Sequence, residues 1–366
     1  MCLFILNADI GIGGNAKTGV YNYGSNGLPY LVVTNSGVSC WLSSDHVDTV
    51  DLQQTTSDST AAAGYLCGNW YGDLVNGGYS AAHDAHYFAH IVYYLYKFWY
   101  GVDPLYNSDG SAKRLVIRVH YGQNYENAFW DGQTMTFGDG YSMFYPLVSL
   151  DVVSHEISHG FTQQHSNLYY YNESGSLNEA FSDMAGQAAR AYLLNMSESN
   201  YAVFFPNDPF GKISWKMAET IVKTPGAALR YMNNPSMDGY SADCMDKSIA
   251  ESNCQISYQD VVNRSGGNQS YIVHYGSGVF NKAFYLIAEA WAKNNQVRVL
   301  PNPYAEGVRE AFNIMVLANV GYWTPTTGFS QAACDVLKAT KAYNYQTSDV
   351  ISAFDKVGVS TSNCSY

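Results

Sequence analysis

Charged residues are scarce in this 366-residue chain, at 14% of the total, and together they carry a net charge of −12. Lysine and arginine number only 19 and do not cluster along the sequence. A protein that binds nucleic acid or an anionic membrane needs clustered cations. Neither is therefore an expected partner.

Long apolar runs are also missing. No segment approaches the ~20 consecutive apolar residues that cross a bilayer as a helix. The opening residues "MCLFILN" lack both the basic start and the length of a secretory signal. The acidic, tyrosine-rich composition nevertheless favours an extracellular protein, so we expect a secreted protein whose signal and pro-segment are not part of this chain.

Cysteine is present, but not in the spacing of a metal site. The seven cysteines include no C-x-x-C pair, and this scatter favours disulfides. The simplest pairing joins neighbours along the chain: Cys40 with Cys67, Cys244 with Cys254, and Cys334 with Cys364. This pairing leaves Cys2 over. The alternative is a set of buried thiols in a cytosolic protein.

The residues that are abundant indicate a globular protein with much β-structure and many turns, since 47% are hydrophobic and Tyr and Gly number 32 each. Length predicts about two domains. Short β-like runs such as "LPYLVV" and "RLVIRVHY" extend to about Tyr145, interrupted by one aromatic-rich run from Ala81 to Tyr100. From Pro146 onward, apolar residues recur at helical spacing. The helices predicted there are Leu147–Gln164, Leu177–Leu194, Ser277–Lys293, Tyr304–Val320, Ser330–Lys341 and a short terminal helix capped by Ser348.

The stretch "SHEISHGF", Ser154 to Phe161, carries two histidines four residues apart. On a helix, His155 and His159 project from one face about one turn apart, so both imidazoles can reach a single ion. A catalytic zinc needs three protein ligands and one open position for water. The third ligand must therefore come from another element.

That element is predicted in "NESGSLNEAFSD", where Ser176 or Asn178 can start a second helix. Glu179 would be the third ligand, and Asp183, one turn further on, would accept the ring N–H of a ligating histidine. Glu156 would serve as general base toward a water whose pKa the zinc lowers. The alternative is an ordinary amphipathic helix with solvated acids.

A second group of histidines lies in "HDAHYFAH". His83, His86 and His90 have the spacing i, i+3 and i+7 and could form another metal-binding face. The favoured interpretation is a buried helix whose histidines belong to the core.

Four stretches resemble a known family: "ENAFWDGQTMTFGDG", "YPLVSLDVVSHEISHGFTQQHSNLYYYNESGSLNEAFSDMAG", "ALRYMNNPSMDG" and "VHYGSGVFNKAFYLI". The chain is similar to the thermolysin-like zinc peptidases, and most of all to their bacterial elastase and vibriolysin branch. The resemblance implies an α+β, two-lobed fold. Its parts would be a β-rich N-terminal domain, residues 1–150, and a mainly helical C-terminal domain, residues 151–366, with the zinc site in the cleft between them.

The resemblance also implies roles for individual residues. His155, His159 and Glu179 would bind zinc, Glu156 would be the base and Asp183 the partner of His155. Further residues are implicated by the resemblance alone: Tyr170 and His274 as donors to the oxyanion, Arg230 as a clamp on the substrate carbonyl, and Asn127 with Ala128 as docking positions for the substrate backbone. A tyrosine and a cationic imidazole suit a place where negative charge develops.

The sequence departs from the family around His274. The acid that orients this histidine in relatives is replaced, because the corresponding positions hold Ile272 and Gln269. We expect His274 either to find another partner, with Asp260 and Asp243 as distant candidates, or to lose its proton more easily, so that activity would fall at a lower pH than in relatives.

A second departure concerns calcium, which prefers several carboxylate and carbonyl oxygens. Asp151 matches a calcium ligand of the family, but other acidic positions are occupied by Gln187, Arg190 and Thr220. We expect the calcium site to be missing or weak, with Asp151 paired to Arg190 instead.

The sequence therefore predicts a secreted, monomeric endopeptidase with one zinc ion. It would act on proteins and peptides, and the resemblance implies a cut on the amino side of bulky hydrophobic residues. Val152 and Leu229 would wall the pocket for such a residue, and the alternative is that both are plain core residues. The alternative is a weakly active or inactive zinc-containing protein that binds peptides. A zinc hydrolase acting on another kind of substrate is disfavoured by the docking stretches "NAFW" and "LRYM".

Overall fold

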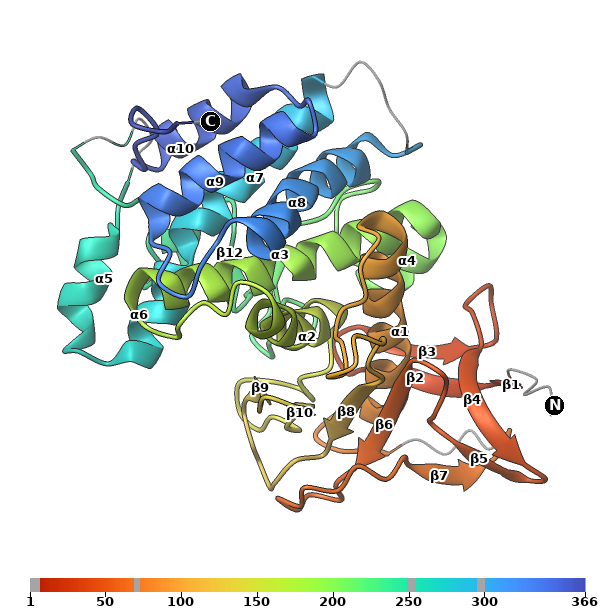
Figure 1. The fold of residues 1–366 in the computed structure, drawn as a ribbon. Helices are drawn as coiled ribbons and strands as arrows, with labels where there is room; N and C mark the ends of the chain where they lie inside the picture. Colours follow the sequence, from red (N-terminus) through yellow and green to blue (C-terminus); the bar gives the residue numbers. More distant parts are fainter. Residues whose placement is uncertain (1–6, 69–72, 249, 251–253, 295–299, 366) are drawn as a thin grey trace. The chain divides into compact units, whose positions relative to one another are not determined.

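Strands dominate the first part of the chain and helices the second in the computed structural model (Figure 1). The structure describes residues 7–68, 73–248, 250, 254–294 and 300–365, which cluster into two units. Unit 1 comprises the described residues of Met1–Gly160 with Ser197–Asp208 and Ala218–Ala227, and unit 2 comprises Phe161–Met196, Pro209–Met217 and the described residues of Ala228–Tyr366. The predicted α+β class, β-rich first and mainly helical second, is confirmed.

Two four-stranded sheets and a hairpin make up the β-structure of unit 1. The first sheet, in the order β1-β4-β5-β7, is antiparallel, and the second has the order β6-β8-β10-β9. In the second sheet β6, β8 and β10 are parallel, whereas β9 runs antiparallel to β10. The strands are β1 (Asn7–Asp9), β2 (Gly11–Asn15), β3 (Gly19–Tyr23), β4 (Leu31–Ser36), β5 (Ser39–Trp41), β6 (Val47–Asp51), β7 (Gly64–Leu66), β8 (Leu115–Val119), β9 (Ala128–Trp130) and β10 (Met135–Phe137), with β2 and β3 forming the hairpin.

Helix α1 (Ala81–Trp99) is the central helix of unit 1. It begins where the Ser80 side chain accepts a hydrogen bond from the His83 N–H, which satisfies one backbone donor of the first turn. Every residue from Ala81 to Tyr93 is buried, and the helix packs against β2, β4, β6 and β8. The core of unit 1 therefore surrounds this helix, which is buried on nearly all sides of its first thirteen residues.

Unit 2 is built mainly of helices, and α7, α8, α9 and α10 pack as neighbours in it (Figure 1). Large aromatic side chains such as Phe181, Phe280 and Phe312 are fully buried there. The helices of the later part of the chain are α3 (Asn172–Met196), α5 (Tyr258–Ser265), α6 (Gln269–Gly276), α7 (Gly278–Asn294), α8 (Pro303–Gly321), α9 (Phe329–Ala342) and α10 (Thr347–Lys356), with the 3-10 helix η1 (Pro235–Asp238) and the strand pair β11 (Lys216–Met217) and β12 (Arg230–Tyr231). Helix α4 (Glu198–Phe204) belongs to unit 1, and α2 (Leu150–Gln164) begins there.

The predicted helices are all present, with some shifted ends. Helix α3 begins at Asn172, earlier than Ser176 or Asn178, and α10 begins at Thr347, so that Ser348 lies inside the helix instead of capping it. Three shorter helices, α4, α5 and α6, were not predicted. Each begins at a side chain that caps its first turn, Ser197, Ser257 or Asn268, a local signal that could have indicated them.

Three disulfides join Cys40 to Cys67, Cys244 to Cys254 and Cys334 to Cys364, which is the pairing predicted from adjacency along the chain. Cys2 lies outside the described residues. Within the described ranges, no helix combines the length and the apolar character that a membrane span requires.

Candidate active site

The two histidines of "SHEISHGF" face each other on α2 in unit 1. Their Nε2 atoms are 3.0 Å apart, and their rings are nearly perpendicular, at 85°. Zinc binds imidazole nitrogen at about 2.0–2.1 Å, so two ligands of a tetrahedral ion lie roughly 3.3 Å from each other. His155 and His159 therefore already have the spacing of two ligands of one ion. Glu156, the predicted base, is buried next to His155.

Helix α2 is held in unit 1 by contacts on both sides of His159. The Tyr96 hydroxyl of α1 lies 2.7 Å from Ser158 Oγ, which itself donates to the Ser154 carbonyl. On the other side, a Cβ atom at Gly160 would lie only 3.1 Å from the Trp130 ring of β9. Glycine at this position lets β9 pack directly against the helix beside His159.

The docking positions Asn127 and Ala128 lie at the edge of the second sheet, because β9 ends the order β6-β8-β10-β9. Gly138 N–H donates to the Asn127 carbonyl at 3.0 Å, and Gly140 N–H donates to the Tyr125 carbonyl at 3.0 Å. Hydrogen-bonded and non-hydrogen-bonded pairs alternate along an antiparallel ladder. The N–H and C=O of Ala128 therefore point away from β10, toward the outer edge.

A second group of predicted residues meets in unit 2. Tyr170 donates a short hydrogen bond to Glu179 Oε1, and His274 Nε2 lies 3.6 Å from the same oxygen. Tyr170 and His274 are themselves close, with Oη 3.4 Å from Nε2. Glu179 is buried, whereas Tyr170 is 47% exposed. The buried carboxylate is that of Glu179, and the two hydrogen-bond donors nearer the surface are Tyr170 and His274. Two such donors can stabilise an anion that forms next to a metal ion held by the carboxylate.

Asp183, one turn beyond Glu179 on α3, binds the predicted clamp Arg230. Arg230 donates from Nε and Nη2 to the two oxygens of Asp183, at 2.7 and 2.6 Å, in a buried bidentate pair. Asn281 Nδ2 of α7 donates to Asp183 as well, at 2.8 Å. Sequence spacing did not reveal Asn281, although it lies in the quoted stretch "VHYGSGVFNKAFYLI". These contacts fix the orientation of the Arg230 guanidinium.

His274 takes its orientation from the backbone. Its Nδ1 lies 2.6 Å from the Ser270 carbonyl one turn earlier in α6. The departures from the family pattern have structural uses, since Ile272 is buried in the core and Gln269 Oε1 accepts from the Asn172 N–H. A neutral carbonyl thus faces the ring nitrogen.

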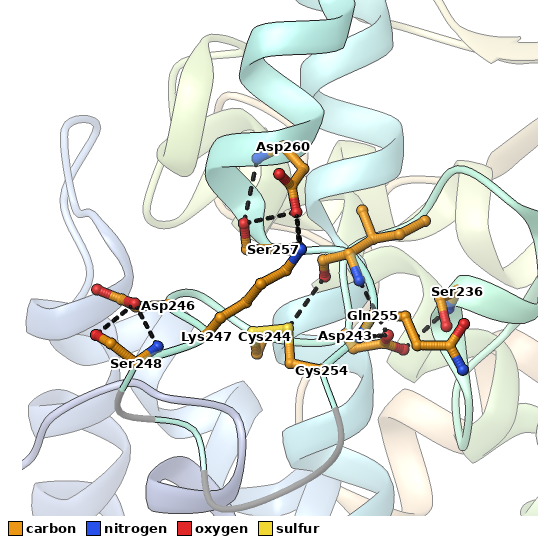
Figure 2. The surroundings of a disulfide bond; sticks show 11 residues. Ser236, Asp243, Cys244, Asp246, Lys247, Ser248, Cys254, Gln255, Ser257 and Asp260 are labelled. Carbon is orange, nitrogen blue, oxygen red and sulfur yellow. Dashed lines mark hydrogen bonds and ion pairs between the residues drawn. A yellow bond between two sulfur atoms is a disulfide. The ribbon is translucent and has the colours of Figure 1, made fainter.

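Both acids considered as partners of His274 are bound elsewhere (Figure 2). Asp260 pairs with Lys247 and completes a capping box with Ser257. Asp243, which is fully buried, accepts hydrogen bonds from the backbone N–H groups of Ser236 and Gln255. These two candidates were wrong, because each carboxylate is used to cap or tie local backbone around the Cys244–Cys254 disulfide.

The residues at the expected calcium positions have other contacts. In unit 1, Asp151 accepts hydrogen bonds from Ser149 Oγ at 2.6 Å and from the Ala218 N–H at 2.8 Å. In unit 2, Arg190 is fully buried and donates to the Lys216 carbonyl at 2.6 Å and to Ser214 Oγ at 3.0 Å. The pairing of Asp151 with Arg190 stays a prediction.

The histidines of α1 are core residues. His86 contacts Thr49 Oγ1 through Nδ1 at 2.9 Å and the Val32 carbonyl through Nε2 at 2.7 Å. His90 likewise contacts Ser44 Oγ and the His86 carbonyl. Burial lowers the pKa of His86, and it lowers that of His90 to about 4. All four ring nitrogens have protein partners, and Nδ1 of His83 lies 2.9 Å from the Ile12 carbonyl. Among the described residues, these three histidines therefore do not form a second metal site.

Comparison with known proteins identifies the family. Residues 16–163 match the model of the thermolysin metallopeptidase catalytic domain, and residues 166–359 match the model of its alpha-helical domain. The chain belongs to the thermolysin family of zinc metallopeptidases, which confirms the resemblance seen in the sequence.

Curated relatives and one solved structure agree with this family. The chain is 42% identical over 356 residues to a hemagglutinin/proteinase of Vibrio cholerae, covering 96% of this chain and 49% of the relative. It is 39% identical over 365 residues to the zinc metalloproteinase MspA of Legionella longbeachae, covering 97% of this chain and 60% of the relative. The precursor of protealysin, a metalloproteinase from Serratia proteamaculans, has a similar fold, with a TM-score of 0.63 at 23% identity over 86% of this chain and 87% of that one. The chain thus spans about half to three fifths of these curated relatives.

Proposed function

We propose that this chain is a zinc-dependent endopeptidase in which His155, His159 and Glu179 hold one zinc ion. The observation that carries the proposal is the pair of Nε2 atoms 3.0 Å apart on α2, with the buried Glu156 beside them. Two imidazoles and a carboxylate form a donor set that can hold a metal ion. It is also the donor set of hydrolytic zinc sites that keep a fourth position open.

Zinc bound to these residues would polarise the substrate carbonyl and make water more acidic. Glu156 then takes the proton of the attacking water and delivers it to the leaving amine, because a carboxylate next to the first ligand can reach both. Tyr170 Oη and His274 Nε2 donate hydrogen bonds to the oxyanion. Their separation of 3.4 Å supports a common acceptor for both.

The substrate backbone would lie along β9 as an added strand. The outward N–H and C=O of Ala128 support this proposal, because an unpaired sheet edge can bind an extended peptide. Arg230, fixed by Asp183, would hold the substrate carbonyl. Val152 is buried and Leu229 is 39% exposed. These two side chains would line a pocket for a bulky apolar substrate residue, and the peptide bond on the amino side of that residue would be cut.

We also propose a secreted monomer made with a pro-segment. Three disulfides support an oxidising compartment. The similar solved fold is that of a precursor. Calcium would be absent or weakly bound, because the buried guanidinium of Arg190 already supplies a positive charge at one of its expected positions.

A second candidate function is peptide binding with weak cleavage. The contact of His274 Nδ1 with a neutral carbonyl, at 2.6 Å, favours it, because no carboxylate strengthens that side of the ring. A casein digest with and without a zinc chelator separates the two functions. Chelator-sensitive turnover supports the peptidase, and peptide binding without turnover supports the alternative.

The proposed function is tested by Glu156→Gln. This change keeps the shape of the side chain but removes the base, so kcat should fall by about a thousandfold or more while one zinc remains bound per chain. Glu198→Gln, the same change at the start of α4, is the matched control and should leave kcat unaltered. Full activity in Glu156→Gln would show that the base is wrong.

A further inference from the structure

His120 occupies an unusual position at the end of β8. Its φ of 57° lies in the left-handed region, which is uncommon for a residue other than glycine and costs about 1 kcal/mol or more. Its side chain is nevertheless buried, with 3% exposed. The surrounding structure must therefore hold this conformation, and sequence reasoning gave no sign of it.

Two carboxylates hold the ring of His120. Nδ1 lies 2.6 Å from Asp139 Oδ1, and Nε2 lies 2.5 Å from Asp73 Oδ2. A carboxylate only accepts hydrogen bonds, so both ring nitrogens must donate, and the ring is a cation. Burial by itself lowers the pKa of His120. The hydrogen bonds to Asp139 and Asp73 raise it by more than burial lowers it, so that the pKa is about 10. The cation therefore persists at neutral pH.

Asp73, one of the two carboxylates that contact His120, is bound to helix α1 at the centre of unit 1. Asp73 Oδ2 also accepts a hydrogen bond from the Ala82 N–H in the first turn of α1, at 3.2 Å. Helix α1 packs against β8, the strand that His120 follows. Through Asp73, the imidazolium is thus anchored to the start of the central helix.

Asp139, the other carboxylate, belongs to the backbone that carries β9. Asp139 lies between Gly138 and Gly140, whose N–H groups bind the carbonyls of Asn127 and Tyr125. The approach is so close that a Cβ atom at Gly138 would lie 2.1 Å from the Tyr125 carbonyl oxygen. Any shift of Asp139 therefore moves the segment from Tyr125 to Ala128 with it.

We propose that His120 is a positioning residue that fixes the substrate-docking edge strand β9 by holding Asp139. This inference rests on the proposed function, in which the substrate backbone pairs with β9. His120 does not touch the substrate or the zinc ligands in this scheme. Its loss should therefore weaken docking while the catalytic groups stay in place.

The test is His120→Asn, because asparagine tolerates the left-handed conformation but cannot bridge both carboxylates. An error of about 1 Å in substrate position can cost on the order of a hundredfold, so a partial displacement should raise KM for an extended peptide about tenfold. The value of kcat should change by less than about twofold, and zinc content should not change. Asp139→Asn should reproduce the rise in KM, and it carries the test if His120→Asn does not fold.

The matched control is His90→Asn, which removes an equally buried histidine of unit 1 that does not contact Asp139. It should lower thermal stability without raising KM. An unchanged KM in folded His120→Asn and Asp139→Asn, or the same rise in His90→Asn, would overturn the inference.

Peptide Kd measured in the Glu156→Gln background separates the inference from the proposed function. His120→Asn should weaken peptide binding there by the same factor as it raises KM. If Glu156→Gln itself retains turnover, the proposed function fails, whereas unchanged Kd on adding His120→Asn contradicts only the positioning role.

Discussion

Helices α1 and α2 each carry a pair of histidines four residues apart, yet the two pairs differ in what their ring nitrogens contact. The rings of His86 and His90 are 4.7 Å apart between centroids, and those of His155 and His159 are 4.6 Å apart. On α1, all four nitrogens bind hydroxyl or carbonyl groups of the core. On α2, the two Nε2 atoms converge on each other. Spacing places two imidazoles together, but the neighbouring elements decide whether they can bind an ion.

The largest expected effect concerns which of the two helices binds zinc. His159→Ala should abolish zinc binding and lower kcat/KM by about a thousandfold or more, because a ligand is removed. His90→Ala should keep one zinc per chain and full specific activity, while it lowers the free energy of unfolding by about 2 kcal/mol through lost packing and hydrogen bonds. Metal analysis and thermal unfolding of both variants check this, and zinc loss in His90→Ala would contradict it.

Acid should remove the contribution of His90, on α1, to the stability of the folded chain. The pKa of His90 in the folded chain is about 4, below its ordinary value of 6.5, so its contribution to stability is complete above pH 6.5 and is lost as pH falls toward 4. A shift of this size corresponds to roughly 3 kcal/mol. Burial raises the pKa of Asp84 to about 7, which acts in the opposite sense, so the informative quantity is a difference between variants.

We expect His90→Gln to lose less stability than the native chain between pH 7 and pH 4.5. Thermal unfolding of both proteins at the two pH values measures the difference. Equal losses would show that His90 does not titrate as its burial requires.

The smallest expected effect concerns the buried cation of unit 2. If the Arg190 guanidinium takes the place of calcium, there is no ion to remove, and a chelator selective for calcium should change Tm by less than about 1 °C. A calcium site filled at a hundred times its Kd would instead contribute about 2.7 kcal/mol, which the chelator would remove. Arg190→Met should instead lower the free energy of unfolding by about 3 kcal/mol, since it removes the buried hydrogen bonds to the Lys216 carbonyl and to Ser214 Oγ. A calcium-dependent rise in Tm of several degrees would contradict this.

The candidate site was only partly predictable for the same reason that the two helices differ. His155, Glu156 and His159 are local in sequence, so helical periodicity alone places them on one turn. The contact between Asp183 and Arg230 joins positions 47 residues apart, and that between Asp183 and Asn281 joins positions 98 residues apart. Spacing does not encode such pairs, and the resemblance to a family supplied Arg230 but not Asn281.

The treatment of His274 shows the same limit. The sequence has Ile272 and Gln269 at the positions where the resemblance implies an acid. It did not reveal that Asp243 and Asp260 are used around the Cys244–Cys254 disulfide, or that the Ser270 carbonyl takes the ring nitrogen. A helix places that carbonyl one turn earlier wherever a histidine occurs, but packing decides which rotamer reaches it.

By itself, the sequence determined the division into strands and helices and the metal-binding spacing on α2, because both depend on periodicity. It made the observed pairing of cysteines the simplest one but did not fix it. Tertiary structure alone decided which groups the rings of His86 and His90 contact, that Asp183 holds Arg230 and Asn281, and that His120 bridges Asp73 and Asp139. These contacts bring together groups from separate elements, and their hydrogen bonds form only once the apolar faces of those elements have packed.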